Sequence, residues 1–389
     1  MESSLVTAEI VPQAHKERVA ELDGVRALAV LAVMAGHLLV PPSSVSRAPS
    51  GLPRPIEAIV THGWLGVDLF FVLSGLLITS ILLGSKANGA AAYFGRFYER
   101  RALRILPLYV LVLAILAIAY VQFTGPGYFA LCLAFAANLA PLAHVAVPNG
   151  GGPLWSLAVE EQFYLFWPVL VLLLNRRALV YVLFAIVVCE PVLRAIHPFD
   201  TEFTWMRADG LAAGALLALW FTSKRRTPRA DAILALALLG VALLIAVVSF
   251  PFGGMGAGTV SIAVRIPQAI CIFAALVIFA VSCSGARSTA ALRIPFAIIT
   301  AEFSYCLYLI HVPLIDGYQT FVNRFAPELP RALGPLGANL LRFAIILCVA
   351  YALAALSRRY LEKPFLRMGR SPSRPAPMEA PAARAGAPV

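Results

Sequence analysis

The first apolar segment of the chain carries two polar side chains that could take part in catalysis. In GVRALAVLAVMAGHLL, Arg26 lies near one end and His37 near the other. Residues 26 and 37 are about three helical turns apart, so their side chains point the same way, roughly 16 Å apart along the axis. An arginine can bind an anion, and a histidine can accept a proton near neutral pH. One helix face therefore offers a cation at one depth and a possible general base at another.

Carboxylates in two further apolar segments could assist such a base. Asp68 lies in HGWLGVDLFFVLSGLLIT, and Glu160 and Glu161 follow Trp155 in LWSLAVEEQFYLFWP. A carboxylate inside a membrane is costly and usually functional. Adjacent helical residues point about 100° apart, so we expect one glutamate, Glu160, to face the bundle interior. Alternatively, Asp68 is a structural partner for an arginine or a histidine, and the two glutamates lie in water at the membrane interface.

Arginines gather before the third apolar segment, in FYERRALRILPLY. Arg101 and Arg104 share a helix face by their i, i+3 spacing, and Arg100 precedes them. Such a cluster either anchors the helix end in the cytoplasm or binds an anion, because a guanidinium group can clamp a phosphate with two hydrogen bonds.

Two further candidates lie in FSYCLYLIHVPLI, where Tyr305 and His311 are found. A lone histidine in an apolar helix is more often a hydrogen-bonded structural residue than a catalytic one. We therefore treat both, like Trp155 and Glu161, as secondary candidates.

The composition indicates an all-α, polytopic membrane protein. Hydrophobic residues make up 60% of the 389-residue chain and charged residues only 13%; the mean hydropathy is +0.82. The net charge of +11 is explained by basic cytoplasmic loops, so we expect no nucleic-acid partner. None of the six cysteines forms a CxxC pair or has the spacing of a metal site, so we expect no bound metal.

About ten membrane spans are expected, with both termini in the cytoplasm. Basic clusters at 96–104, 175–177, 224–226, 287–293 and 358–359 all fall on one side if the segment 128–143 does not cross the membrane. That segment is then re-entrant or interfacial. The predicted spans are 25–40, 64–83, 105–123, 154–174, 178–196, 211–221, 232–250, 260–281, 295–315 and 338–356.

We expect one membrane domain over residues 22–366, a cytoplasmic segment over 1–21 and a disordered tail over 371–389 that is rich in Pro, Ala and Arg. No fused soluble domain is expected. With this topology, Arg26 and the arginine cluster lie toward the cytoplasm. His37, Asp68, Glu160 and His311 lie in the outer half.

The motifs together resemble the acyltransferase-3 family of integral membrane acyltransferases, whose members O-acylate carbohydrates and some antibiotics. In chain order they are Arg26-x10-His37, GVDLFFVLSGLLI, RRALRILP, WSLAVEEQFY, FSYCLYLIHVPL and LEKPF, and they cover roughly residues 22–365. The chain has Ala301 where the family usually has a glycine before its FSY segment, which affects packing only. Some members of the family carry an additional hydrolase-like domain.

The resemblance implies a cytoplasmic acyl-CoA donor, with acetyl-CoA as the family default, and no permanently bound cofactor. It also implies catalytic importance for Arg26, His37, Arg100, Arg101 and Arg104. In this interpretation the arginines bind the phosphates of coenzyme A, His37 is the general base, and Asp68 or Glu160 orients its ring.

The acceptor would be the hydroxyl of a carbohydrate, a lipid-linked glycan or a glycosylated metabolite, and the expected location is the bacterial inner membrane. The alternative class is a secondary transporter or a flippase, whose polar side chains would line a substrate path. The absence of an internal repeat and the tight arginine cluster count against that class.

Overall fold

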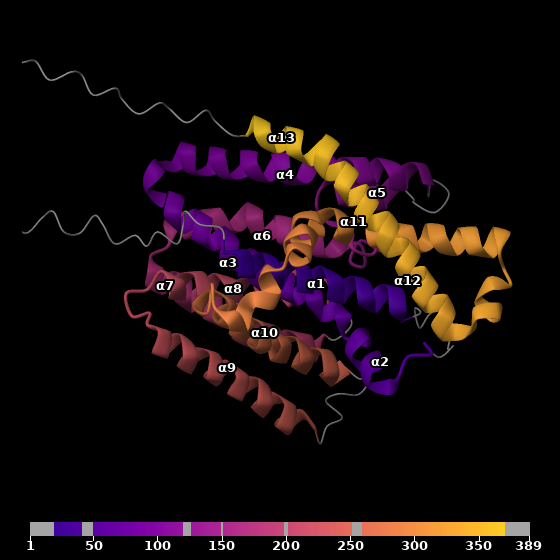
Figure 1. Ribbon diagram of the computed structural model, residues 1–389. Helices are drawn as coiled ribbons and strands as arrows, with labels where there is room; N and C mark the ends of the chain where they lie inside the picture. Colours follow the sequence, from indigo (N-terminus) through magenta and orange to yellow (C-terminus); the bar gives the residue numbers. More distant parts are fainter. Residues whose placement is uncertain are drawn as a thin grey trace, which may run out of the picture.

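The computed structural model describes residues 19–40, 50–119, 126–148, 151–197, 201–250 and 259–369. All regular structure in these ranges is helical, and most of the long helices lie roughly alongside one another (Figure 1). The tail at 371–389 lies outside the described residues. The helices are α1 (Ala20–Leu39), α2 (Arg54–Thr61), α3 (Gly66–Ser85), α4 (Ala90–Ala119), α5 (Pro126–Leu133), α6 (Leu154–Leu173), α7 (Arg176–Ile196), α8 (Ala208–Phe221), α9 (Pro228–Ser249), α10 (Thr259–Ser282), α11 (Pro295–Phe325), α12 (Leu329–Ser357) and α13 (Lys363–Met368).

The outer surface of this bundle is apolar, as a lipid-facing surface must be. Phe184 of α7 is 61% exposed, and Leu236 and Leu243 of α9 are 68% and 66% exposed. Soluble proteins rarely leave such contiguous apolar surface in water. Within the described residues, nine helices are long and apolar enough to cross a membrane. The protein is therefore an integral membrane protein built as an all-α bundle.

Each of the ten predicted spans coincides with a helix in the described residues, but α8 is shorter than the other nine helices. Its 14 residues extend only about 21 Å, whereas a hydrocarbon core is about 30 Å thick. The start of α8 is instead satisfied within the protein. The carboxylate of Glu190 accepts hydrogen bonds from the backbone N–H groups of Ala208 (3.2 Å) and Asp209 (2.8 Å).

Buried charges on α7 and α8 complete this arrangement. Arg194 is fully buried, forms an ion pair with Asp209, and donates a hydrogen bond to the Met206 carbonyl at 2.6 Å. It also lies 3.6 Å from the carboxylate of Glu190, one helical turn earlier in α7, at the i, i+4 spacing that brings two side chains together. Because Glu190 satisfies the first N–H groups of α8 and the nearby charges are paired, α8 can begin inside the protein rather than at the membrane surface.

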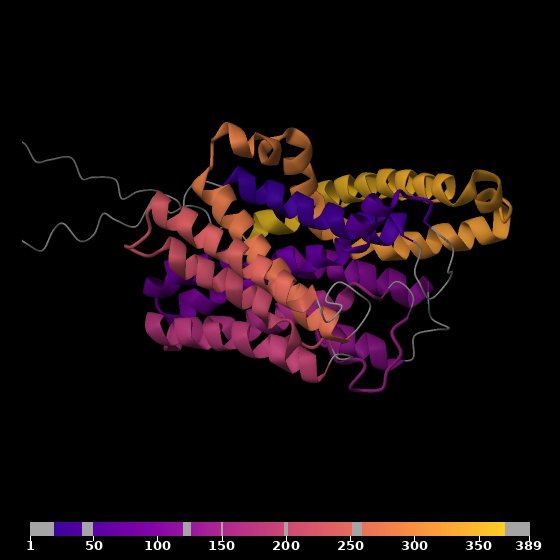
Figure 2. The ribbon, with the colours of Figure 1, turned by 90° about the horizontal axis from the view of Figure 1, so that it is seen from below.

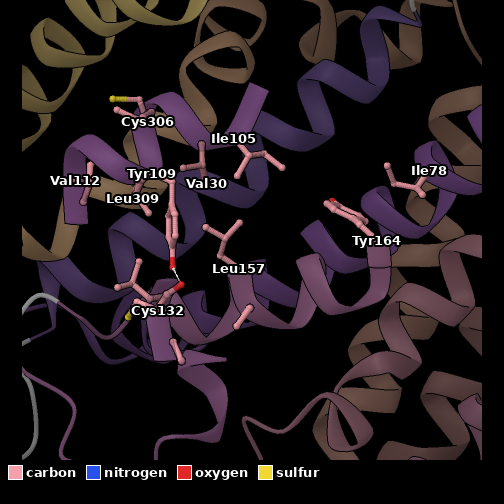
Figure 3. Close-up of a cluster of buried hydrophobic side chains, with 14 of the residues drawn as sticks. Val30, Ile78, Ile105, Tyr109, Val112, Cys132, Leu157, Tyr164, Cys306 and Leu309 are labelled. Carbon is pink, nitrogen blue, oxygen red and sulfur yellow. Dashed lines mark hydrogen bonds between the residues drawn. The ribbon is translucent and has the colours of Figure 1, made fainter. Parts of the chain in front are cut away.

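The segment 128–143 does not form a crossing helix. Its helical part is the eight-residue α5 and a short 3₁₀ turn, Ala137–Leu139. Tyr109 of α4 ties it to the core by donating a hydrogen bond to the Cys132 carbonyl at 2.9 Å, within a cluster that includes Ile105 and Leu157 (Figure 3). This agrees with the expectation that 128–143 does not span the membrane.

Helix α1 lies inside the bundle, where it packs against α3, α10, α11 and α12. In Figure 2 the indigo α1 lies beside the orange and yellow helices α11 and α12. The chemistry-bearing residues of α1 are therefore surrounded by the other motif-bearing helices.

Glycines allow α3 to approach its neighbours closely. A Cβ atom on Gly75 would lie 2.0 Å from the Leu211 carbonyl oxygen of α8, and one on Gly214 would lie 2.0 Å from the Val72 carbonyl oxygen of α3. Gly75 and Gly214 thus let the backbones of α3 and α8 pack closely against each other.

Gly75→Ala should lower the thermal stability of the detergent-purified protein, because overpacking a closely packed site typically costs about 1–3 kcal/mol. Gly84→Ala, on the same helix with no atom within 4 Å of the added Cβ, is the matched control. The measurement is the temperature at which each variant loses its monodisperse gel-filtration peak. Equal temperatures for the two variants would contradict the packing argument.

Candidate active site

A cavity in the middle of the bundle is lined by five of the motif-bearing helices. Arg26 comes from α1, Arg101 and Arg104 from α4, Glu160 from α6 and Tyr305 from α11, and further residues come from α3. Four of the six sequence motifs that define the candidate site thus converge here together with Arg26. The remaining lining residues are Val67, Phe70, Phe71, Ser74, Ile105, Ser156, Leu157, Tyr164, Ser304 and Tyr308.

The charged side chains that line this cavity are mostly positive. Arg26, Arg101 and Arg104 line it, with Glu160 as the carboxylate on its wall. Aromatic rings hold the guanidinium group of Arg101, which lies 5.3 Å from the ring centre of Tyr164 and 5.9 Å from that of Phe97. Stacked arginines keep their planar donor groups in a fixed orientation, which favours binding of a phosphate or carboxylate.

Arg100 does not share this arrangement. Its side chain is exposed and is not part of the cavity lining. The reason is helical geometry, since Arg101 and Arg104 are one turn apart whereas Arg100 points about 100° away from Arg101. The structure brings Arg26 together with Arg101 and Arg104 and leaves Arg100 on the outside.

The two glutamates point into different cavities. Glu160 faces the central cavity, as expected, whereas Glu161 lines a second cavity with Tyr98, Gln162 and the segment at 134–135. Arg101 borders both cavities. The 100° separation of neighbouring helical residues accounts for this division.

His37 pairs with His311 rather than with a carboxylate. The Nδ1 atom of His37 lies 3.3 Å from Nε2 of His311 and 3.0 Å from the carbonyl oxygen of Val33. Among the described residues, neither Asp68 nor Glu160 forms a hydrogen bond with His37. The expectation that one of these carboxylates orients the His37 ring is therefore wrong, because the side chain beside it comes from α11.

The histidine pair adjoins Tyr308 of the cavity lining. Tyr308 lines the cavity, and its backbone carbonyl accepts a hydrogen bond from Nδ1 of His311 at 2.6 Å. His311 is fully buried, whereas His37 is exposed. His37 is thus accessible from outside the bundle while one tyrosine separates it from the cavity.

Asp68 has a different partner, Arg207. The fully buried Asp68 carboxylate lies 3.0 Å from a terminal nitrogen of Arg207. The guanidinium group of Arg207 also lies 5.2 Å from the ring centre of Trp155 and 6.0 Å from that of Trp64. Burial raises the pKa of Glu202, in the loop before α8, and the nearby charge of Arg207 opposes that rise.

Arg207 was not singled out from the sequence. The available signal was an arginine directly before a short apolar segment, in a chain with an unpaired membrane carboxylate at position 68. The other secondary candidates have structural contacts: Tyr305 lines the cavity and donates to the Ile105 carbonyl at 3.0 Å, and Trp155 packs on Arg207.

This arrangement is a cavity inside the helix bundle that is lined by three arginines and adjoins a histidine pair through Tyr308. Residues 19–359 match the Acyl_transf_3 family, described as an acyltransferase domain, so the chain belongs to that family. The resemblance drawn from the six motifs is confirmed.

Curated relatives are longer proteins. The chain is 34% identical over 171 residues to the peptidoglycan O-acetyltransferase OatA of Listeria monocytogenes, covering 40% of this chain and 25% of that protein. It is 32% identical over 236 residues to YrhL of Bacillus subtilis, which is named as a candidate peptidoglycan O-acetyltransferase. This match covers 54% of this chain and 34% of YrhL. It is 25% identical over 392 residues to a candidate O-acetyltransferase of Staphylococcus aureus, and this match covers 90% of this chain and 57% of that protein. No solved structure matches the chain significantly.

Proposed function

We propose that this protein transfers an acetyl group from acetyl-CoA to a hydroxyl group of a carbohydrate. The observation that carries the proposal is the cavity itself, which is lined by three arginines and by Tyr308, the residue that bonds to His311 of the histidine pair. The names of the relatives from Listeria and Bacillus support an acetyl group and a peptidoglycan-like acceptor.

The arginines suit the donor. Coenzyme A carries several phosphate groups, and Arg26, Arg101 and Arg104 offer planar, bidentate donors to them. The rest of the lining is mostly apolar or hydroxyl-bearing, which suits the uncharged pantetheine arm. With the nucleotide at the arginines, the thioester would lie toward Tyr308.

The exposed histidine suits the acceptor. His37 would take the proton of the acceptor hydroxyl as its oxygen attacks the thioester carbonyl. The new C–O bond then replaces the C–S bond, and coenzyme A leaves as a thiolate that recovers the proton from His37. Products are the O-acetylated acceptor and free coenzyme A.

The test uses purified protein in liposomes with radiolabelled acetyl-CoA and soluble peptidoglycan fragments. We expect label to appear on the sugar with release of an equal amount of coenzyme A. A protein that binds acetyl-CoA but moves unmodified sugar into the vesicles, with no labelled product, would instead be a carrier.

The proposal places the arginine end in the cytoplasm and His37 on the outer side of a bacterial inner membrane. Reporter fusions after Arg226 and after Met368 should both report the cytoplasm, and a fusion after Ser249 should report the opposite side. An external signal after Arg226 or Met368 would reverse the direction in which donor and acceptor approach.

A further inference from the structure

The hydrogen bonds around His311 define which of its nitrogens carries a proton. Nδ1 of His311 lies 2.6 Å from the backbone oxygen of Tyr308. A carbonyl oxygen only accepts hydrogen bonds, so Nδ1 of His311 must be the N–H donor. A neutral imidazole has one N–H group, which leaves Nε2 of His311 with a lone pair.

The same reasoning then applies to His37. Its Nδ1 atom lies 3.3 Å from Nε2 of His311 and 3.0 Å from the Val33 carbonyl oxygen, and both of these atoms are acceptors. Nδ1 of His37 therefore carries the proton and shares it between them. Nε2 of His37 is left unprotonated, and it has no recorded partner in the described part of the chain.

The opposite arrangement would require a charged His311. If Nε2 of His311 donated to His37, both nitrogens of this fully buried ring would carry protons. Burying a charge is costly without a partner of opposite sign, and the described residues place no carboxylate in contact with either ring. The charge on that side is positive, since Arg342 of α12 donates to the carbonyl of Leu38, next to His37, at 2.6 and 3.0 Å.

We propose that His311 is a positioning residue that, together with the Val33 carbonyl, holds His37 in the tautomer with a free Nε2, the atom that accepts the proton of the acceptor hydroxyl. This rests on the proposed function. When Nε2 of His37 takes the proton, the His37 ring becomes positively charged, and Nε2 of His311 continues to accept the bond from its Nδ1–H. His311 thus fixes the tautomer and orientation of the proton-accepting histidine, as the aspartate does in a Ser-His-Asp triad, but with a neutral ring.

Two substitutions separate the acceptor role from simple packing. The side-chain oxygen of His311→Gln can still accept from His37, and its amide N–H can still donate to Tyr308. His311→Leu fills similar space but has no acceptor. We expect His311→Leu to lower kcat by about 10²-fold with little change in donor affinity, and His311→Gln to retain most of the activity. His197→Leu, at an exposed position that ends α7, is the control.

Equal losses in the Leu and Gln variants, with both proteins monodisperse, would overturn the positioning role. So would full turnover in a folded Leu variant. A parallel rise of the donor Kd in the Leu variant would instead indicate that the whole cavity is distorted.

A measurement independent of activity tests the tautomer itself. ¹⁵N NMR of histidine-labelled protein distinguishes protonated from unprotonated ring nitrogens, and the His37→Gln spectrum assigns the His37 signals. We expect His37 to show Nδ1–H with a free Nε2. This preference should be weakened in His311→Leu, where the Val33 carbonyl is the remaining acceptor, and kept in His311→Gln. A His37 ring protonated at Nε2 would overturn the inference even if the protein transfers acetyl groups. The expected spectrum in a protein without transferase activity would leave the histidine pair intact and reject the proposed function.

Discussion

His37→Ala is expected to reduce acetyl transfer by about 10²–10⁴-fold, the range typical for loss of general acid–base catalysis. His37 is the exposed member of a histidine pair next to Tyr308 of the cavity lining, so its removal deletes the base without opening the core. The measurement is turnover of acetyl-CoA with a fixed sugar acceptor, together with the donor Kd, which should remain nearly constant.

His197→Ala provides the comparison for His37→Ala, because it removes an exposed histidine from the end of α7. Turnover near that of the unaltered protein in a folded His37→Ala variant would remove His37 from the reaction. The proton would then have to pass to another group at the cavity.

Neutralising Arg101 and Arg104 together should weaken donor binding by about two or more orders of magnitude. Hydrogen bonds to charged groups contribute about 1.5–3 kcal/mol each, and every 1.4 kcal/mol corresponds to a tenfold change in Kd. The measurement is coenzyme A binding by calorimetry to the Arg101→Gln/Arg104→Gln protein. Lysine at both positions should restore only part of the affinity, because lysine keeps the charge but loses the bidentate geometry.

Two exposed arginines of the same helix serve as controls for that experiment. Arg96 and Arg100 lie outside the cavity lining, so Arg96→Gln and Arg100→Gln should leave coenzyme A affinity almost unchanged. If the Arg101/Arg104 protein bound coenzyme A as tightly as these controls, both arginines would be topology anchors and the donor site would lie elsewhere.

The sequence predicted the helices well because hydrophobic length is a local property. Even the short run at 211–221 was recognised, and it forms α8. The apolar residues of this segment do not reveal how α8 begins. Glu190 of α7 accepts a hydrogen bond from the Asp209 N–H group, and Arg194 of α7 pairs with the Asp209 carboxylate. Such compensation depends on tertiary packing.

The site was predicted where helical periodicity was sufficient and missed where the partner lies far along the chain. Spacing grouped Arg101 with Arg104 and placed Glu160 apart from Glu161, and the same rule applied strictly would have set Arg100 aside. The partner of His37 comes from a helix 274 positions away, and the partner of Asp68 is Arg207. No pattern within either segment identifies these pairs.

The buried charges of α7 and α8 have a consequence for how the newly made chain enters the membrane. Glu190 and Arg194 lie in the last two turns of α7, and charged residues inside a membrane are costly unless they are paired. α8, too short to hold a position across the bilayer by itself, brings Asp209 to Arg194 and places its own first N–H groups on Glu190. We therefore expect the translocation machinery to release these two helices into lipid as one hairpin, so that the charges are paired before they leave the aqueous channel.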